Sequence, residues 1–331
     1  MKKLKHIRWG IIGCGNVAEV KSGPAFDKAN NSSLVAVMRR NANKAKDYAL
    51  RHGVQNWYSD ADALINDPDV DAVYVATPPD SHAFYTKKII ECGKPVYVEK
   101  PMAHSYQECL EMINVSEKYS IPLYVAYYRR SLSYFLKVKE LLDSHAIGKP
   151  RSFSIHLYLP PRNEDLDRMN PHWRVKSDIA GAGYFYDMGS HQVDLIDFFF
   201  GPISWTKGVS TNQAGLYEVE DMVAAMFGYD SGLTGIGQWI FTTHQSAKTD
   251  LFEIVGSEGK ISFSSFEFTP IILKNTRGEQ LFDLKPPQHI QQPMIQSVVN
   301  DLIHHEFVAD NSRAAARTSK IMDVILGRYD A

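Results

Sequence analysis

The sequence predicts an α/β protein with two domains, a doubly wound parallel sheet followed by a larger, mostly antiparallel sheet. The chain has 331 residues, which is long for a single hydrophobic core. Up to residue 127, short apolar runs alternate with helix-length segments. From residue 128 onward, successive extended segments are joined by short turns, as in an antiparallel sheet that leaves one face open. We therefore expect domains at 1–127 and 128–331.

Five apolar runs predict the strands of the first domain. They are rich in β-branched and aromatic residues, as strands buried on both faces of a parallel sheet are. These runs are IRWGII, SLVAVM, VDAVYVAT, PVYVE and IPLYVAY. The intervening segments NANKAKDYALRHG and SHAFYTKKIIECG are amphipathic and end at Gly53 and Gly93, which are helix stop signals. Strand–helix alternation at this period predicts a doubly wound sheet.

The second half has a different pattern of predicted secondary structure, with successive strands and few intervening helices. Its predicted strands are SFSIHLYL, MVAAMFGY, LTGIGQWIF, DLFEIVG and GKISFS, and SFSIHLYL alternates apolar and polar residues. Helical stretches near 290–305 and 312–328 finish the chain.

Composition narrows the class of function. The chain is 44% apolar and 22% charged, with a formal net charge of −2. It has no concentrated basic run and no apolar stretch as long as a membrane span, so we expect neither nucleic acid nor a membrane as partner. The three cysteines lack metal-ligand spacing, which favours reduced thiols in a cytoplasmic protein.

A glycine-rich turn, GIIGCGNVA, overlaps the end of the first predicted strand and leads into a helix. Gly13, Gly15 and Ala18 fit the pattern G-x-G-x-x-A, which allows a sharp turn, close approach of a pyrophosphate and tight helix packing. The following helix N-terminus would offer free N–H groups to phosphates. The pattern favours a dinucleotide site over a purely structural turn. The predicted binding residues are Gly13, Cys14, Gly15, Asn16 and Val17.

Basic residues follow the second predicted strand, where an NAD site usually has an acidic residue. Arg39 and Arg40 suit a ribose 2′-phosphate through bidentate, charge-assisted contacts, and Lys44 lies one turn further on. The alternative is a solvated basic helix start. We favour NADP(H), and NAD(H) stays open.

The strand VYVE leads directly into Glu99-Lys100-Pro101. Ligands bind at the carboxyl edge of such sheets, so Lys100 is placed to stabilise or protonate a substrate oxygen, with Glu99 holding it. A simple turn is the alternative. We also place Glu99 and Lys100 among the cofactor-binding residues.

The segment GAGYFYDMGSHQVDL has Asp187 and His191 four residues apart, on one face of a predicted helix. A carboxylate beside an imidazole orients it and raises its proton affinity, which suits a general acid/base. Helix capping by Asp187 beside a packed histidine is one alternative. A metal site with Asp194 is another, which we rank lower because Lys100 would repel the cation.

Taken together, these motifs resemble the Gfo/Idh/MocA family of oxidoreductases. The resemblance runs nearly end to end, through GIIGCGNVA, DPDVDAVYVATPPDSH, GKPVYVEKP, IGKPRSF, WR with GAGYFYDMGSHQVDL, and FEIVGSEGKISF. It implies an N-terminal Rossmann domain and a C-terminal α/β domain with a large, mostly antiparallel sheet. It also implies NAD(P)-dependent hydride transfer to or from a sugar, polyol or related compound.

The resemblance assigns roles residue by residue. Lys100 matches the catalytic lysine of the family, and Asp187 and His191 match its acid/base pair. It further implies cofactor contacts from a loop of the first domain and a Trp-Arg pair of the second, namely Thr77, Pro78, Pro79, His82, Trp173 and Arg174.

The segments HLYLPPRN and IFTTHQSAKTDLFEIVGSEG look most like the branch that contains 1,5-anhydrofructose reductases, which commonly prefers NADP(H). Where that branch often has Asn, this chain has VAYYRR, so no role is assigned to Tyr127 or Arg129. Two rival functions remain open. One is a catalytically silent dinucleotide-binding sensor or scaffold, and the other is NAD-dependent glycoside cleavage.

His156 and Tyr158 share one face of the predicted strand SFSIHLYL. They are candidates to line the substrate pocket, or else to lie in an interface between subunits. Because the family usually pairs its open sheet face with another subunit, we expect a homo-oligomer, a dimer or a tetramer.

Overall fold

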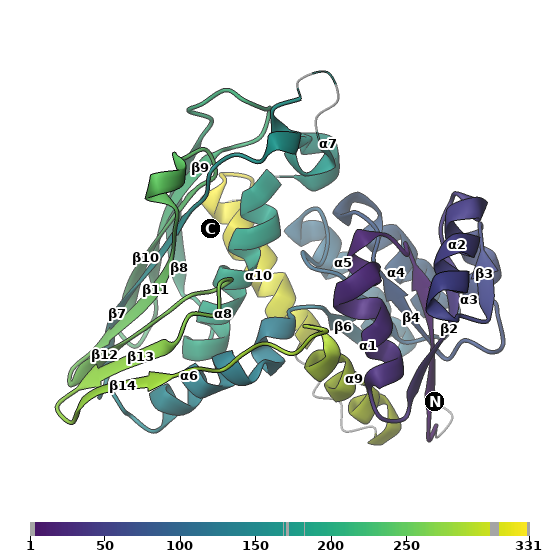
Figure 1. Cartoon of the computed structure of the whole chain (residues 1–331), viewed down its shortest axis with the longest axis horizontal. Helices are drawn as coiled ribbons and strands as arrows, with labels where there is room; N and C mark the ends of the chain where they lie inside the picture. Colours follow the sequence, from purple (N-terminus) through teal and green to yellow (C-terminus); the bar gives the residue numbers. More distant parts are fainter. Residues whose placement is uncertain (1–3, 168, 170–171, 182, 305–310, 330–331) are drawn as a thin grey trace. The chain divides into compact units, whose positions relative to one another are not determined.

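The computed structural model describes residues 4–167, 169, 172–181, 183–304 and 311–329. The chain forms two compact units (Figure 1). Unit 1 comprises Met1–Ser131 and Pro287–Ala316, and unit 2 comprises Leu132–Pro286 and Arg317–Ala331. The units therefore do not follow the single boundary predicted at residue 127. After the last strand of unit 2, the chain returns to unit 1 and contributes a helix there.

Unit 1 contains the predicted parallel sheet. Its strands are β1 (Ile7–Ile12), β2 (Ser32–Met38), β3 (Asn56–Tyr58), β4 (Ala72–Val75), β5 (Val96–Val98) and β6 (Leu123–Val125). They are ordered β3-β2-β1-β4-β5-β6 and all pairs are parallel. The order reverses between β1 and β4, which is the point where open sheets of this kind bind ligands. The prediction of a doubly wound sheet is confirmed.

Helices cover both faces of this sheet. They are α1 (Gly23–Lys28), α2 (Ala42–His52), α3 (Ala61–Ile65), α4 (His82–Glu91), α5 (Tyr106–Tyr119), α9 (Gln292–His304) and the first part of α10 (Asn311–Ile325). An aliphatic core joins one face of the sheet to α3, α4 and α5. The other face has rings in a row, with Trp9 against Phe26 of α1, Phe26 against Tyr74, and Tyr74 stacked on Tyr97. Helix α9 contacts both α1 and β1.

Unit 2 contains the larger sheet. Its strands are β7 (Pro150–Tyr158), β8 (Trp205–Thr211), β9 (Met222–Gly228), β10 (Thr234–Ile240), β11 (Thr249–Gly256), β12 (Gly259–Phe263), β13 (Ile271–Asn275) and β14 (Gly278–Phe282). The order is β14-β13-β12-β11-β7-β10-β9-β8. Only the β7–β10 pair is parallel, so the prediction of a mostly antiparallel sheet is confirmed.

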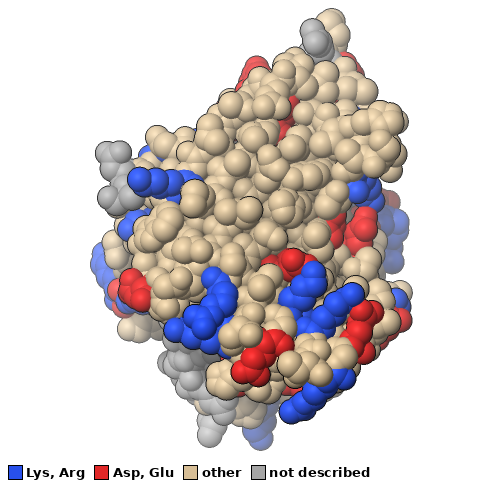
Figure 2. Space-filling model, turned by 90° about the vertical axis from the view of Figure 1, so that its left-hand side faces the viewer, with Lys and Arg blue, Asp and Glu red and all other residues tan. Residues whose placement is uncertain are grey.

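One face of this sheet is packed and the other is open. Its helices are α6 (Ser133–Asp143), α7 (Ser177–Ala180) and α8 (Ser190–Phe200). Phe199 and Phe200 of α8 pack against Phe153 and Phe252 of the sheet. The opposite face bears exposed apolar side chains, among them Ile236. Figure 2 shows this face as a broad area without charged residues, with Lys, Arg, Asp and Glu gathered toward one end.

No helix in the described part of the chain is long and apolar enough to cross a membrane.

Candidate active site

Gly13 and Gly15 shape the turn after β1 in different ways. Gly13 has φ +92°, and a Cβ there would lie 2.8 Å from the side chain of Thr77 and 2.9 Å from the backbone of Ala76. A Cβ at Gly15 would meet, among the described residues, only the carbonyl oxygen of Gly13 at 3.8 Å. The fold itself therefore leaves room at Gly15. This is the room that a pyrophosphate approaching the backbone needs, so the turn fits a dinucleotide.

A helix follows the turn, as predicted, and it has unusual geometry. Ala18 is fully buried and starts a π-helix, η1 (Ala18–Ser22), that leads into α1. A second π-helix, η6 (Phe185–Gly189), carries Asp187. Well under 1% of residues adopt this conformation, and it occurs frequently at functional sites. The two π-helices of the described chain thus coincide with two of the predicted motifs.

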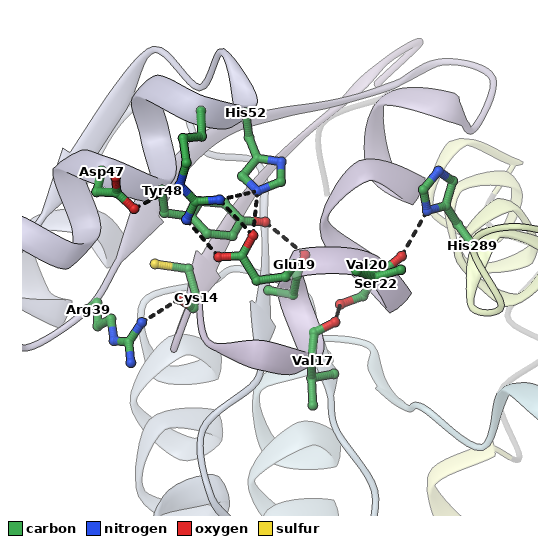
Figure 3. Close-up of polar contacts among 12 residues, drawn as sticks. Cys14, Val17, Glu19, Val20, Ser22, Arg39, Asp47, Tyr48, His52 and His289 are labelled. Carbon is green, nitrogen blue, oxygen red and sulfur yellow. Dashed lines mark hydrogen bonds and ion pairs between the residues drawn. The ribbon is translucent and has the colours of Figure 1, made fainter.

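The predicted phosphate-binding cations follow the end of β2. Arg39 Nη1 donates to the carbonyl oxygen of Cys14 at 3.4 Å, so its side chain reaches the glycine turn (Figure 3). Arg40 and Lys44 are exposed, and Asn41 caps α2 by accepting from the Lys44 backbone at 3.1 Å. Burial raises the pKa of the Cys14 thiol to about 11, so this residue contributes its backbone rather than a thiolate.

Glu19 in η1 joins the turn helix to α2. Its carboxylate accepts from Arg51 Nη2 at 2.7 Å and Nη1 at 2.9 Å, and lies 2.8 Å from His52 Nε2 (Figure 3). Arg51 also donates to Asp47 at 2.8 Å. The hydrogen bonds from Arg51 lower the pKa of Glu19 to about 2, so Glu19 is ionised at neutral pH.

The predicted loop Thr77, Pro78, Pro79 and His82 follows β4 directly. Ser81 Oγ donates to Thr77 Oγ1 at 2.9 Å. His82 is fully buried, and its ring nitrogens lie 2.8 Å from the carbonyl oxygen of Thr77 and 3.0 Å from that of Pro101. Burial lowers the pKa of His82. His82 therefore ties the loop after β4 to the turn after β5.

Glu99 is buried beside Lys100 at the end of β5. Its Oε1 accepts from Tyr74 Oη and Gln291 Nε2, both at 2.5 Å, and its Oε2 accepts from the Lys100 backbone N–H at 3.1 Å. The sequence motif suggested that Glu99 holds the ammonium of Lys100. The structure shows its carboxylate accepting from the Lys100 backbone N–H, and the contact with the ammonium stays a prediction. The peptide bond after Lys100 is cis. Lys100 itself is half-buried at the predicted sheet edge.

The second motif lies entirely in unit 2, where η6 leads into α8. Arg174 Nε donates to Asp187 Oδ2 at 3.0 Å, and the Arg174 guanidinium lies 4.6 Å from the ring centre of Trp173. His191, in the first turn of α8, is buried with its ring 6.2 Å from that of Phe266. Asp187 and His191 therefore lie in two consecutive helices, η6 and α8. Asp187 also has a cationic partner, Arg174, which the four-residue spacing of Asp187 and His191 did not predict.

Two further predictions concerned residues outside these motifs. Tyr127 and Arg129, for which no role was predicted, are both buried, and Arg129 Nη1 donates to Tyr128 Oη at 3.2 Å. His156 and Tyr158 lie on the open face of the sheet, away from α8, and are 2.9 Å apart between Nδ1 and Oη. Their roles in a substrate pocket or in a subunit interface both stay predictions.

Possible metal ligands come together in unit 2 apart from the predicted motif. In the described part of the chain, the grouping of three possible ligands is Glu164, Asp165 and His172, which differs from the Asp187–His191–Asp194 alternative. Both oxygens of Asp165 already accept from Tyr184 Oη, at 2.8 and 2.9 Å.

Gln291 is the neighbour of Glu99 that sequence reasoning missed. It lies 192 residues away in a stretch assigned to the second domain, and no motif marks it. Only its packing against β5 reveals the contact.

Comparisons with known proteins agree with this geometry. A model described as "Oxidoreductase family, NAD-binding Rossmann fold" matches residues 7–127, and the GFO/IDH/MocA C-terminal domain model matches residues 135–262. Oxidoreductase P35 from Formosa agariphila is 41% identical over 324 residues, covering 97% of this chain and 99% of that protein.

Two further similarities are more distant. The 1,5-anhydro-D-fructose reductase of Ensifer adhaerens is 28% identical over 287 residues, covering 84% of this chain and 83% of that protein. The solved structure of levoglucosan dehydrogenase in complex with NADH and levoglucosan superposes with a TM-score of 0.85 at 23% identity, covering 98% of this chain and 97% of that one. At this identity the likeness shows the fold. The two domain matches and the end-to-end relative place this chain in the Gfo/Idh/MocA family of NAD(P)-dependent oxidoreductases.

Proposed function

We propose that the chain transfers a hydride between a nicotinamide dinucleotide and a hydroxyl or carbonyl carbon of a sugar, polyol or related compound. Family membership supports the reaction type, and the names of the anhydrofructose reductase and levoglucosan dehydrogenase support the substrate class. The observation that carries the proposal is Lys100, held by Glu99 at the carboxyl end of β5, in the same unit as the glycine turn.

Each side chain has a distinct role in this proposal. The dinucleotide, when bound at the glycine turn, supplies the hydride donor or acceptor. The Lys100 ammonium donates a hydrogen bond to the reacting oxygen and stabilises the negative charge that develops there. His191 exchanges the proton, and Asp187 orients its ring while Arg174 holds Asp187. Such proton transfer contributes about 10²–10⁴-fold.

The cofactor preference follows from charge. Arg39, Arg40 and Lys44 put positive charge after β2, and no acidic residue stands at the strand end to bind ribose hydroxyls. We therefore propose that NADP(H) is preferred over NAD(H). The predicted cofactor contacts from the loop after β4 and from the Trp-Arg pair stay Thr77, Pro78, Pro79, His82, Trp173 and Arg174.

Absorbance at 340 nm with NADPH or NADH and a panel of sugars and polyols tests the activity. We expect Lys100→Met to reduce turnover at least about 10³-fold, because the oxygen loses its charged hydrogen-bond donor. NADPH affinity, measured by fluorescence titration, should change less than about threefold. Near-normal turnover in this variant would exclude the role given to Lys100.

The same assay separates the rival functions. Binding of NADPH without turnover of any sugar would favour a sensor. Free sugars released from glycosides, without net change at 340 nm, would favour transient oxidation during glycoside cleavage.

We also propose that the open face of the unit 2 sheet pairs with a second copy of the chain, as a dimer or within a tetramer. Two observations support this proposal: a broad area of the face has no charged residues, and apolar side chains are exposed on it (Figure 2). The three cysteines form no disulfide with one another, which supports a reducing, cytoplasmic location.

A further inference from the structure

The segment just before α9 is buried against two separate parts of unit 1. His289 and Gln291 are 7% and 1% exposed, although they lie between β14 and α9 in neither a helix nor a strand. A buried glutamine must satisfy both ends of its amide, and Gln291 does so with two different partners.

One end of the amide reaches the Glu99 carboxylate. A carboxylate only accepts hydrogen bonds, so the amide nitrogen of Gln291 must face Glu99 Oε1, which lies 2.5 Å away. This leaves Gln291 Oε1 to accept from Tyr97 Oη at 3.1 Å. The Tyr97 ring is stacked on Tyr74, whose own hydroxyl donates to the same carboxylate oxygen. The orientation of the amide is therefore fixed.

The carboxylate passes this constraint on to Lys100. With Oε1 held by two donors, Glu99 Oε2 is directed at the Lys100 backbone N–H, 3.1 Å away. Without the Gln291 amide, Oε1 would lose one of these two donors and the carboxylate could rotate more freely. The backbone position from which the lysine side chain starts would then be less well defined.

The same segment is attached to the helix of the glycine turn. His289 Nδ1 lies 2.8 Å from the carbonyl oxygen of Val20 (Figure 3), so the proton is on Nδ1. The Gln291 backbone N–H donates to the carbonyl oxygen of Lys21 at 3.4 Å. Val20 and Lys21 both belong to η1. One short segment thus contacts both the turn helix and Glu99.

We propose that Gln291 is a positioning residue for Lys100, acting through the Glu99 carboxylate, and that His289 anchors it to the glycine-turn helix. The catalytic consequence rests on the proposed function of Lys100. The structural consequence, a restrained Lys100 backbone, does not.

Gln291→Met tests this with a side chain of similar length and no amide. We expect kcat to fall about 10- to 100-fold, while the KM for sugar and the dissociation constant of NADPH change less than about threefold. In protein labelled with ¹⁵N-lysine, hydrogen exchange of the Lys100 amide should accelerate at least tenfold, with other lysine amides unchanged. The Lys100 signal is assigned by its loss in Lys100→Arg.

Two variants accompany it. Gln296→Met is the matched control, because Gln296 lies in α9, the helix that follows Gln291, and accepts from the Asn30 backbone N–H at 2.7 Å. In Gln296→Met, kcat and the hydrogen-exchange rate of the Lys100 amide should both equal those of the wild type. Tyr97→Phe removes only the hydroxyl that orients the amide, and should give a smaller change in the same direction even if Gln291→Met folds poorly.

The outcomes separate the two proposals. A wild-type chain that turns over no substrate overturns the proposed function, while faster Lys100 exchange in Gln291→Met still supports the positioning role. An active wild type with unchanged exchange and kcat in both Gln291→Met and Tyr97→Phe overturns the positioning role alone. A uniform rise in exchange at all lysines would mean general destabilisation and also overturns it.

Discussion

Gly13 and Gly15 stand two positions apart and lack a side chain for different reasons. At Gly13, a left-handed φ and the nearby Thr77 exclude any Cβ. At Gly15, the protein itself imposes no such restriction. Within this turn, Gly13 is therefore required by the fold, whereas Gly15 is required only if a ligand approaches the backbone.

Alanine at each position should expose this difference. Gly13→Ala should lower the free energy of unfolding by about 1–3 kcal/mol, because it adds backbone strain and a clash. Gly15→Ala should leave unfolding within about 0.5 kcal/mol of wild type and weaken NADPH binding at least tenfold. Urea unfolding and fluorescence titration measure the two effects. Unchanged NADPH affinity in Gly15→Ala would contradict the dinucleotide assignment of the turn.

Site residues were predictable from the sequence where they stand in a short motif, and not where only tertiary packing brings them to the site. Lys100 and Asp187 stand in short motifs whose position after a strand or on a helix indicates their chemistry. The partners that hold them do not. Arg174 reaches Asp187 and Gln291 reaches Glu99 only through tertiary packing. The two backbone carbonyls that lie within 3.0 Å of the buried His82 ring were likewise not predictable from its motif, and its contact with the cofactor stays a prediction.

At the scale of elements, Glu19 links η1 to α2 and so connects the glycine turn with the helix that begins among the predicted phosphate-binding cations. The link has a pH dependence. Because the folded pKa of Glu19, about 2, is below its ordinary value of 4.5, the ion pair stabilises the fold above about pH 4.5. This stabilisation is lost as pH falls from about 4.5 to 2.

Glu19→Gln should therefore lower the free energy of unfolding at pH 7 by about 1 kcal/mol, a value reduced because the partner Arg51 is half exposed. The difference from wild type should shrink as pH falls below about 4.5. Urea unfolding at pH 7, 5 and 3.5 measures it, with Asp47→Asn as an exposed control. A difference that stays constant with pH would show that the ion pair is not its cause.

Strands were predictable where at least one face is buried, and most of the missed strands have few buried residues. The run IRWGII coincides with β1, SLVAVM covers all of β2 but its first residue, and the other three runs each contain one strand. No prediction covered β3, β8, β13 or β14. β3 has three residues and no buried one, β8 has a single buried residue and β14 none, so they lack an apolar period. Their place comes from pairing with a neighbouring strand.

At the scale of the molecule, the open sheet face of unit 2 is the main exposed apolar feature. Paired strands present Met226 and Ile236 on it, and Leu251 and Val255 continue it on β11. A face of this kind is usually covered by another protein surface. His156 and Tyr158 lie on it as well.

Ile236→Lys should weaken self-association at least tenfold, because it places an unpaired charge at the centre of this face. Light scattering after size-exclusion chromatography measures the mass. Leu50→Lys, at an exposed position on α2, is the control and should leave the mass unchanged. A wild-type chain that is monomeric at micromolar concentration would refute the pairing.

The return of the chain from β14 into unit 1 limits how this fold can be recombined. The chain passes between the units at three points, near residues 131, 286 and 316. A chimaera of two relatives made with one crossover near residue 131 would take Glu99 from one parent and Gln291 from the other. Exchange of a whole dinucleotide-binding unit therefore needs a graft of residues 287–316 as well.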